Sequence, residues 1–319
     1  MYSRENYQKI KNEIEARRIR AINEAEQRNF EVAAKSEDIR LIDRELRGTG
    51  LLLFKTACAG GDIAPIRERN KLLIASRAES LSKLGLPADY TEPRYTCKIC
   101  SDSGFVGTKM CSCFREMLIT ENIKSSGMGS LIDKQSFDNF DLEWYRANDD
   151  AYSRMKTNLD IATDFANNFN TSSGETLLFF GKTGTGKTHL STAIAKKVIE
   201  SGFEVLYDSA QNIVSAFETD RFKSGYGPYE PKGDKYLECD LLILDDLGTE
   251  FVNQFTVSCL YNVINTRLNK GKKTIISTNL TQDEFRKKYW DRIASRVFGE
   301  YLILPFCGED VRRQKLNGK

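Results

Sequence analysis

The chain of 319 residues lacks the features that would place it in a membrane or an export pathway. It has no apolar run long enough to span a membrane, and its charged first residues, Met1 to Glu5, lack the apolar segment of a signal peptide. We therefore expect a cytoplasmic protein without membrane association. In that compartment the eight cysteines stay reduced, so a cluster of them indicates a metal site rather than disulfides.

The chain also has little histidine and a small net charge. The single histidine is His189, and the formal net charge is only +2, so the total charge identifies no class of partner. The chain has 40% hydrophobic and 29% charged residues, which is typical of folded proteins and not of disordered or fibrous ones. Its length allows two domains.

A phosphate-binding motif follows an apolar run at residues 177–180. Residues 181–188 match G-x-x-x-x-G-K-[ST] and lead into a helical pattern. Glycines let successive backbone N–H groups point at a polyphosphate, and the helix adds the positive end of its dipole. A ligand-free glycine turn would not need the full motif between a strand and a helix. The residues expected to bind nucleotide are Gly181, Lys182, Thr183, Gly184, Thr185, Gly186, Lys187, Thr188 and His189.

Two carboxylates follow a second apolar run at residues 241–244, which is a Walker B pattern. We expect Asp245 to bind the nucleotide's Mg²⁺ together with the Thr188 hydroxyl, and Asp246 to orient and deprotonate the attacking water. The alternative is a strand that merely ends in a polar turn. A later strand, 273–277, leads into Asn279, whose amide is expected beside the γ-phosphate.

The strand pattern predicts an α/β fold. Apolar runs at 177–180, 204–208, 241–244, 273–277 and 301–305 alternate with helical segments, one of them from about 147 to 169. This order predicts a five-stranded parallel sheet covered on both faces, with the ligand at the carboxyl ends of the strands.

The first half of the chain is expected to be mainly helical. Residues 3–47 are charged and show an apolar stripe of helical period, which predicts a long helix or hairpin ended by Gly48, Thr49 and Gly50. A second helix is expected over 63–84. The pattern leaves open whether this arm packs on its own domain or docks a partner protein.

Four cysteines with the spacing C-x₂-C-x₁₀-C-x-C form a candidate zinc site. Cys97, Cys100, Cys111 and Cys113 would bind Zn²⁺ tetrahedrally through thiolates alone, because His189 lies far away in the sequence. Free thiols in a β-hairpin and an iron–sulfur cluster are the alternatives. The other cysteines stand singly in apolar surroundings and are expected in the core: Cys58, Cys239, Cys259 and Cys307.

The motifs together resemble the AAA+ ATPases of the DnaC/DnaI helicase-loader group, to which the transposition helper IstB belongs. The similarity rests on residues 181–190, 242–248, 276–280 and 291–299, and it extends to 137–142 and 308–313. Asp245-Asp246 departs from the Asp-Glu common among AAA+ proteins at large. The resemblance implies an AAA+ P-loop ATPase domain at 126–319, after a turn-rich stretch at Ser125–Ser130. Residues 1–125 would form a helical N-terminal domain with a small zinc-binding-like module.

The resemblance also implies roles and partners. It makes Asn279 sensor 1, Arg296 the arginine finger (with Arg292 as second choice) and Arg312 the sensor-2 arginine (with Arg313 as second choice). It implies ATP, Mg²⁺ and Zn²⁺ as cofactors, and self-association through the ATPase domain.

The implied function is loading of a DnaB-type replicative helicase, bound through residues 1–125, onto single-stranded DNA. Aromatic and basic residues at 217–229 would contact that DNA, unless their aromatics pack inward. The rivals are an IstB-like transposition helper, which would act with a transposase, and a metabolic P-loop kinase.

Overall fold

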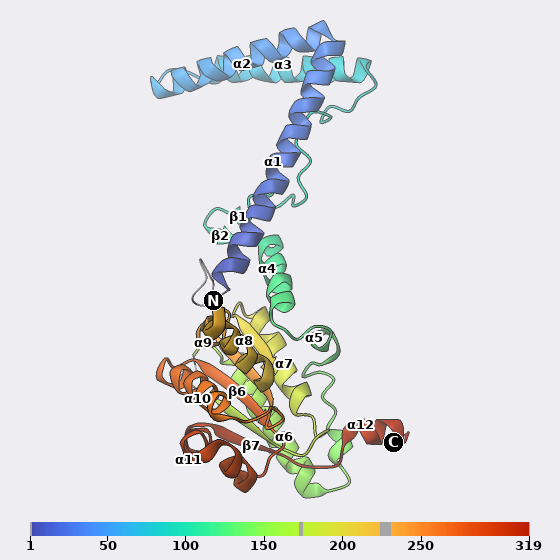
Figure 1. Ribbon diagram of the computed structural model, residues 1–319. Coiled ribbons are helices and arrows are strands. Elements are labelled where there is room, and N and C mark those ends of the chain that lie inside the picture. Colours follow the sequence, from blue (N-terminus) through green and yellow to red (C-terminus); the bar gives the residue numbers. More distant parts are fainter. Residues whose placement is uncertain (1, 172–174, 224–230, 319) are drawn as a thin grey trace. The chain divides into compact units, whose positions relative to one another are not determined.

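Five apolar strands form one parallel sheet in the computed structural model, which describes residues 2–171, 175–223 and 231–318 (Figure 1). The strands run in the order β4-β5-β6-β3-β7, and every neighbouring pair is parallel. The predicted five-stranded parallel sheet is therefore confirmed. The strands are β3 (Leu177–Gly181), β4 (Val205–Ser209), β5 (Leu241–Leu247), β6 (Lys273–Thr278) and β7 (Leu302–Phe306).

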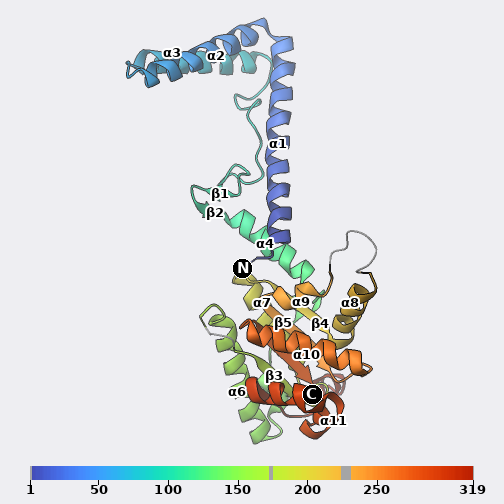
Figure 2. The same ribbon diagram turned by 60° about the vertical axis from the view of Figure 1, so that its left-hand side comes forward.

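Helices cover both faces of this sheet (Figure 2). Side chains on β5 alternate between the faces, so that Leu241 and Ile243 join one apolar cluster while Leu242 and Leu244 join the other. The first cluster includes residues of α6 (Asp149–Asn167) and α7 (Lys187–Glu200). The second includes residues of α8 (Ala210–Lys223), α9 (Asp234–Glu238), α10 (Gln254–Asn269) and α11 (Gln282–Glu300).

Short elements flank the sheet near the carboxyl ends of its strands. They are α5 (Leu131–Lys134), the 3₁₀ helix η1 (Leu142–Tyr145) and α12 (Val311–Leu316). The predicted helix over about 147–169 is confirmed as α6. Strand β5 is longer than expected, because it continues through both aspartates to Leu247.

The contacts divide the chain into two units. One unit contains residues 1–8 and 116–319, and the other contains residues 9–115. The division falls inside α1 (Arg4–Lys35) and α4 (Ser112–Ser125), so each of these helices contributes to both units. Among the helices of the described ranges, none is both long and apolar enough to cross a membrane.

The unit of residues 9–115 is built mainly from α1, α2 (Glu37–Cys58) and α3 (Ala64–Lys83). Helices α2 and α3 lie side by side as an antiparallel pair (Figure 1). The predicted helix over 63–84 is confirmed as α3. A small hairpin of β1 (Phe105–Val106) and β2 (Lys109–Met110) carries the cysteine-bearing turns.

The predicted helix end at Gly48, Thr49 and Gly50 is wrong. Helix α2 continues through these residues to Cys58, where it still pairs with α3. Thr49 is buried and its hydroxyl donates to the carbonyls of Glu45 and Leu46, so packing outweighs the weak helix propensity of the glycines. The break lies instead at Ser36, whose hydroxyl caps α2 by accepting from the Ile39 N–H at 3.4 Å.

A polar cluster joins the helices of this unit. Arg77 on α3 donates to Asp43 of α2 at 2.7 Å, to Thr91 at 2.9 Å and to Asn29 of α1. Close by, an apolar cluster contains Val32, Ile39 and Leu81. A half-buried arginine therefore links all three helices of the arm, next to a small apolar cluster.

Candidate nucleotide site and cysteine cluster

The loop between β3 and α7 has the strained backbone that its glycines allow. Gly184 has φ +80° and Gly186 has φ +95°. A Cβ atom at Gly184 would lie 2.1 Å from the Asp310 side chain, and one at Gly186 would lie 2.7 Å from the Tyr145 hydroxyl. Both positions need glycine because of conformation and close approach together. Helix α7 begins at Lys187, so its amino terminus faces the loop.

Lys187 lies buried within the loop. Its ammonium donates to the carbonyls of Gly181 at 2.7 Å and Lys182 at 2.8 Å. Burial lowers the pKa of Lys187, while the nearby charges of Asp246 and Asp245 oppose that shift. The cation is thus fixed at the centre of the loop, where a phosphate could replace its carbonyl partners.

Asp245 is surrounded by hydroxyl groups. The Thr188 hydroxyl donates to Asp245 Oδ2 at 3.3 Å, the Tyr207 hydroxyl donates to the same oxygen, and the Ser277 hydroxyl donates to Oδ1. Hydroxyl and carboxylate oxygens are the hard ligands that Mg²⁺ prefers, so Thr188 and Asp245 fit the metal that the sequence predicts here. Tyr207 was not predicted from the sequence, because a tyrosine within a short strand belongs to none of the nucleotide-binding motifs.

Asp246 faces the nucleotide loop from the end of β5. Its φ is +51°, and its backbone N–H donates to the Ser277 hydroxyl at 2.9 Å. Burial and the neighbouring Asp245 charge raise the pKa of Asp246, while Lys187 and Arg312 act in the opposite direction. A carboxyl group with a raised pKa can accept a proton more readily, as a general base must.

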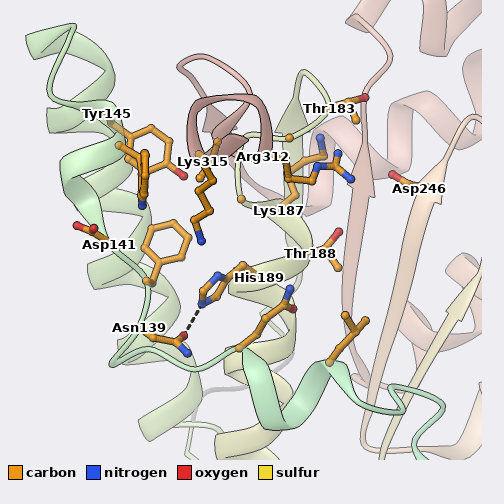
Figure 3. A pocket seen from close by; sticks show the side chains of 17 residues that line it. Asn139, Asp141, Tyr145, Thr183, Lys187, Thr188, His189, Asp246, Arg312 and Lys315 are labelled. Carbon is orange, nitrogen blue, oxygen red and sulfur yellow. Dashed lines mark hydrogen bonds between the residues drawn. The ribbon is translucent and has the colours of Figure 1, made fainter. Parts of the chain in front are cut away.

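These side chains border a pocket of about 410 Å³ (Figure 3). Three segments line it: residues 131–145, the loop and start of α7, and α12. Asp246 joins them from β5. The lining residues are Leu131, Gln135, Asn139, Phe140, Asp141, Trp144, Tyr145, Thr183, Gly184, Gly186, Lys187, Thr188, His189, Asp246, Val311, Arg312 and Lys315.

The wall formed by residues 131–145 is the part of the pocket that the sequence motifs missed. The His189 ring meets Asn139 Oδ1 at 2.8 Å and the Ser136 carbonyl at 3.0 Å, and it packs edge-on against Phe140. Burial lowers the pKa of His189, which favours its neutral form. The Tyr145 hydroxyl donates to the Thr185 carbonyl at 3.0 Å. His189 therefore joins this wall to α7.

Helix α12 brings Arg312 to the pocket. The Val311 N–H donates to the Gly184 carbonyl at 3.0 Å, and this hydrogen bond anchors the helix to the loop. Arg312 extends toward Lys187 and Asp246 in Figure 3. Arg313 is exposed and does not line the pocket. Of the two candidate arginines in this tract, the structure brings Arg312 into the site.

Asn279 and Arg296 do not line this pocket. Asn279 is exposed and directly follows β6. The Arg296 guanidinium donates to Asn265 Oδ1 at 2.7 Å and lies 5.0 Å from the centre of the Tyr261 ring. Arg292, the second choice, is exposed. Neither arginine on α11 belongs to the pocket of its own chain.

The segment predicted to contact DNA is only partly described. Residues 224–230 lie outside the described residues. Within the described part, Phe222 is 77% exposed, whereas Phe217 packs partly against the second apolar cluster. Arg221 lies 5.6 Å from the centre of the Phe255 ring.

The four clustered cysteines converge as a metal site requires. Their sulfur atoms all lie within 4.8 Å of one another, with Cys97 and Cys111 at 3.8 Å and Cys100 and Cys113 at 3.6 Å. Zn–S bonds of about 2.3 Å in a tetrahedron place sulfur atoms about 3.8 Å apart, so these thiols fit Zn²⁺.

Backbone groups support the cysteine cluster. The Asp102 carboxylate accepts from the N–H groups of Thr96 and Cys97 at 2.8 Å each. A hydrogen bond from the Cys100 backbone lowers the pKa of Cys97 to about 7. Burial and the neighbouring thiols raise the pKa of Cys113, a direction that a bound dication would reverse.

The four isolated cysteines differ in how deeply they are buried. Cys239 and Cys259 are buried, as predicted. The prediction for Cys58 is wrong, because it is exposed at the last position of α2, and Cys307 is only partly buried.

Comparison with known proteins gives consistent results. Residues 124–306 match the family described as IstB-like ATP binding protein. The replicative helicase loader DnaC of Escherichia coli strain K12 is 26% identical over 206 residues, which are 64% of this chain and 80% of that protein. A putative insertion sequence ATP-binding protein of Sinorhizobium fredii is 32% identical over 118 residues, 37% of this chain and 38% of that protein.

Two solved structures are also similar to parts of the chain. A DnaC helicase loader matches with a TM-score of 0.44 and 23% identity over 54% of this chain and 98% of that one. DnaI matches with a TM-score of 0.44 and 21% identity over 58% of this chain and 94% of that one. Because the family match spans more than half of the 319 residues, the chain belongs to the IstB-like ATP-binding proteins, and its predicted resemblance to the DnaC/DnaI group of AAA+ ATPases is confirmed.

Proposed function

We propose that the chain is an ATPase that loads a DnaB-type replicative helicase onto single-stranded DNA. The observation that carries the ATPase part is the pocket where Lys187, Asp246 and Arg312 converge on the glycine loop. The loop N–H groups and the α7 dipole would hold the phosphates, with Lys187 reaching the β- and γ-phosphates. Residues 181–189 and Asp245 form this ATP site, with residues 126–319 as the ATPase domain.

Hydrolysis would use the two aspartates differently. Thr188 and Asp245 would hold Mg²⁺, which neutralises charge on the phosphates. Asp246 would orient the attacking water and accept its proton, and Asn279 would help to position that water. Arg312 would stabilise negative charge on the phosphates from within the same chain.

A second arginine would come from a neighbouring copy. Arg312 is the one arginine among the described residues that line the pocket, while Arg296 lies elsewhere against Asn265 and Tyr261. Self-association through the ATPase domain would bring Arg296 to the neighbour's nucleotide, where developing charge is greatest. We expect Arg296→Ala to bind ATP but to lose assembly-stimulated hydrolysis.

Complementation tests this arrangement. A mixture of the Arg296→Ala and Lys187→Ala proteins should recover part of the activity, because one supplies the arginine and the other supplies the nucleotide site. Specific activity that stays constant over a wide range of protein concentration would contradict a shared site. So would normal hydrolysis by Arg296→Ala in the presence of single-stranded DNA and helicase.

The loader role is supported by similarity to DnaC over 80% of that protein. We assign helicase binding to residues 1–125, with Zn²⁺ on the four clustered cysteines, and single-stranded DNA binding to the ATPase domain. Purified protein should capture the host's replicative helicase, and capture should depend on ATP. Removal of residues 1–125 should abolish capture, and failure of the full chain to bind the helicase would contradict the assignment.

The alternative is a transposition helper that acts with a transposase. The match to an insertion sequence ATP-binding protein favours it. Capture of a transposase instead of the helicase, together with preference for duplex DNA, would support this alternative.

A further inference from the structure

Tyr207 lies beside the proposed Mg²⁺ site, yet none of the sequence motifs includes it. It sits on β4, opposite Ile243 of β5 in the strand register. Its hydroxyl donates to Asp245 Oδ2, the same oxygen that accepts from the Thr188 hydroxyl. A side chain from the neighbouring strand thus contacts the carboxylate assigned to the metal.

The hydrogen bonds of Asp245 leave little freedom to its carboxylate. Three hydroxyls, from Thr188, Tyr207 and Ser277, donate to its two oxygens. A carboxylate offers about four acceptor directions, so these donors occupy most of them and fix the plane of the group.

The segment that follows α4 contacts the backbone of Tyr207. The Tyr207 N–H donates to the Ser126 carbonyl at 2.7 Å. The next residue, Gly127, has φ +85°, and a Cβ atom there would lie 2.4 Å from the Tyr207 carbonyl oxygen. Since β4 is the edge strand of the sheet, this segment covers its open side.

We propose that Tyr207 is a positioning residue that orients Asp245 for Mg²⁺, and that Ser126 and Gly127 hold Tyr207 in place. The segment entering the ATPase domain thereby supports the metal site. This inference rests on the proposed ATPase function, in which Asp245 holds Mg²⁺.

Tyr207→Phe removes the hydroxyl while keeping the ring. We expect the Mg²⁺ concentration for half-maximal binding of a fluorescent ATP analogue to rise on the order of tenfold, the usual effect of one hydrogen bond to a charged group. Affinity for the analogue in EDTA should stay unchanged, because the loop and Lys187 are intact. A loss of general stability would lower both affinities together.

Tyr236→Phe is the matched control. The Tyr236 hydroxyl donates to Asp208 Oδ2 at 2.7 Å, so it too joins a buried tyrosine to a carboxylate of the β4 region, but it does not reach Asp245. Its Mg²⁺ requirement should equal that of the wild type.

Gly127→Ala tests whether residues 126–127 hold Tyr207 in place. Its Cβ atom would collide with the Tyr207 carbonyl, so it should raise the Mg²⁺ requirement as Tyr207→Phe does, and the double variant should show no further increase. Gly129→Ala is its control, because Gly129 also has a positive φ but open space around it.

The two proposals fail in different ways. Wild-type protein that binds no ATP analogue with Mg²⁺ would overturn the ATPase function itself. Wild-type binding with an unchanged or lower Mg²⁺ requirement in Tyr207→Phe would overturn only the role of Tyr207. Additive effects of Tyr207→Phe and Gly127→Ala would overturn the role of the segment at residues 126–127.

Discussion

The unit that carries the parallel sheet (residues 1–8 and 116–319) and the unit of residues 9–115 bury their apolar side chains differently. In the first, five strands lie between two apolar clusters, and the polar side chains gather where β3 and β5 end. In the second, long helices leave large apolar side chains exposed on the α2–α3 pair. These are Leu41, Leu51, Leu52, Phe54, Leu72 and Ile74.

The first unit therefore has a core centred on a sheet, whereas the α2–α3 pair of the second leaves apolar side chains exposed. A sheet covered on both faces can fix a nucleotide pocket within one chain, while the proposed hydrolysis takes a second arginine from a neighbouring copy. The α2–α3 pair leaves these apolar side chains exposed, and exposed apolar patches are typical of surfaces that bind another protein. This contrast supports the proposal that residues 1–125 bind the partner and the ATPase domain binds ATP.

The largest expected effect concerns the nucleotide loop of the sheet-bearing unit. Lys187→Ala should weaken ATP binding on the order of 100-fold or more, because it removes the cation at the centre of the loop. Titration with a fluorescent ATP analogue measures it, and zinc content should not change. Lys197→Ala, an exposed position on the same helix, is the control. Unchanged affinity in Lys187→Ala would contradict the assignment of the loop.

The second expected effect belongs to the other unit. Purified protein should contain about one Zn²⁺ per chain, and Cys100→Ser should release it because three thiolates hold the ion less tightly. Hydrogen exchange should increase within residues 9–115, while ATP binding stays intact. Cys58→Ser, at an exposed isolated cysteine, should keep the metal. Absence of zinc from wild-type protein prepared without chelator would refute the site, and iron would indicate a cluster.

A smaller effect tests the polar cluster of the arm. Arg77→Ala should destabilise the α1–α2–α3 region by about 1–3 kcal/mol. The change removes the hydrogen-bond donor of two partially buried side chains, Asp43 and Asn29. Hydrogen exchange of the arm measures the change. Arg69→Ala is matched to it, since the exposed Arg69–Glu45 ion pair at 3.1 Å should contribute below about 1 kcal/mol. Equal effects of the two changes would contradict a special role for Arg77.

The smallest expected effect is a shift in pH dependence. In the proposed mechanism hydrolysis needs Asp246 as a carboxylate, so activity at saturating ATP should fall as the pH drops through its raised pKa. The positive charge of Arg312 lowers that pKa, and Arg312→Ala should therefore move the acidic limb of the profile to higher pH. Arg313→Ala, at the exposed neighbour, should leave the limb in place. A shift to lower pH in Arg312→Ala would contradict the assignment of Asp246 as the base.

Local patterns were sufficient to predict much of the fold. The apolar runs predicted all the strands of the sheet, because a strand buried on both faces must be apolar throughout. The helix end at Gly48–Gly50 was predicted wrongly, because intrinsic propensity is weak and pairing with α3 outweighs it. The exposed position of Cys58 was missed because an apolar neighbourhood in sequence does not ensure a partner surface in space.

The sequence by itself determined the nucleotide loop, the positions of the strands along the chain and the grouping of four cysteines, because each depends on residues that are close in the chain or on a regular period. Only the tertiary structure decided which distant residues meet there. It brought residues 131–145 and α12 to the loop, placed Arg312 but not Arg313 at the pocket, and placed the Tyr207 hydroxyl on Asp245. Such contacts depend on strand order and on the packing of separate segments, which no local pattern encodes.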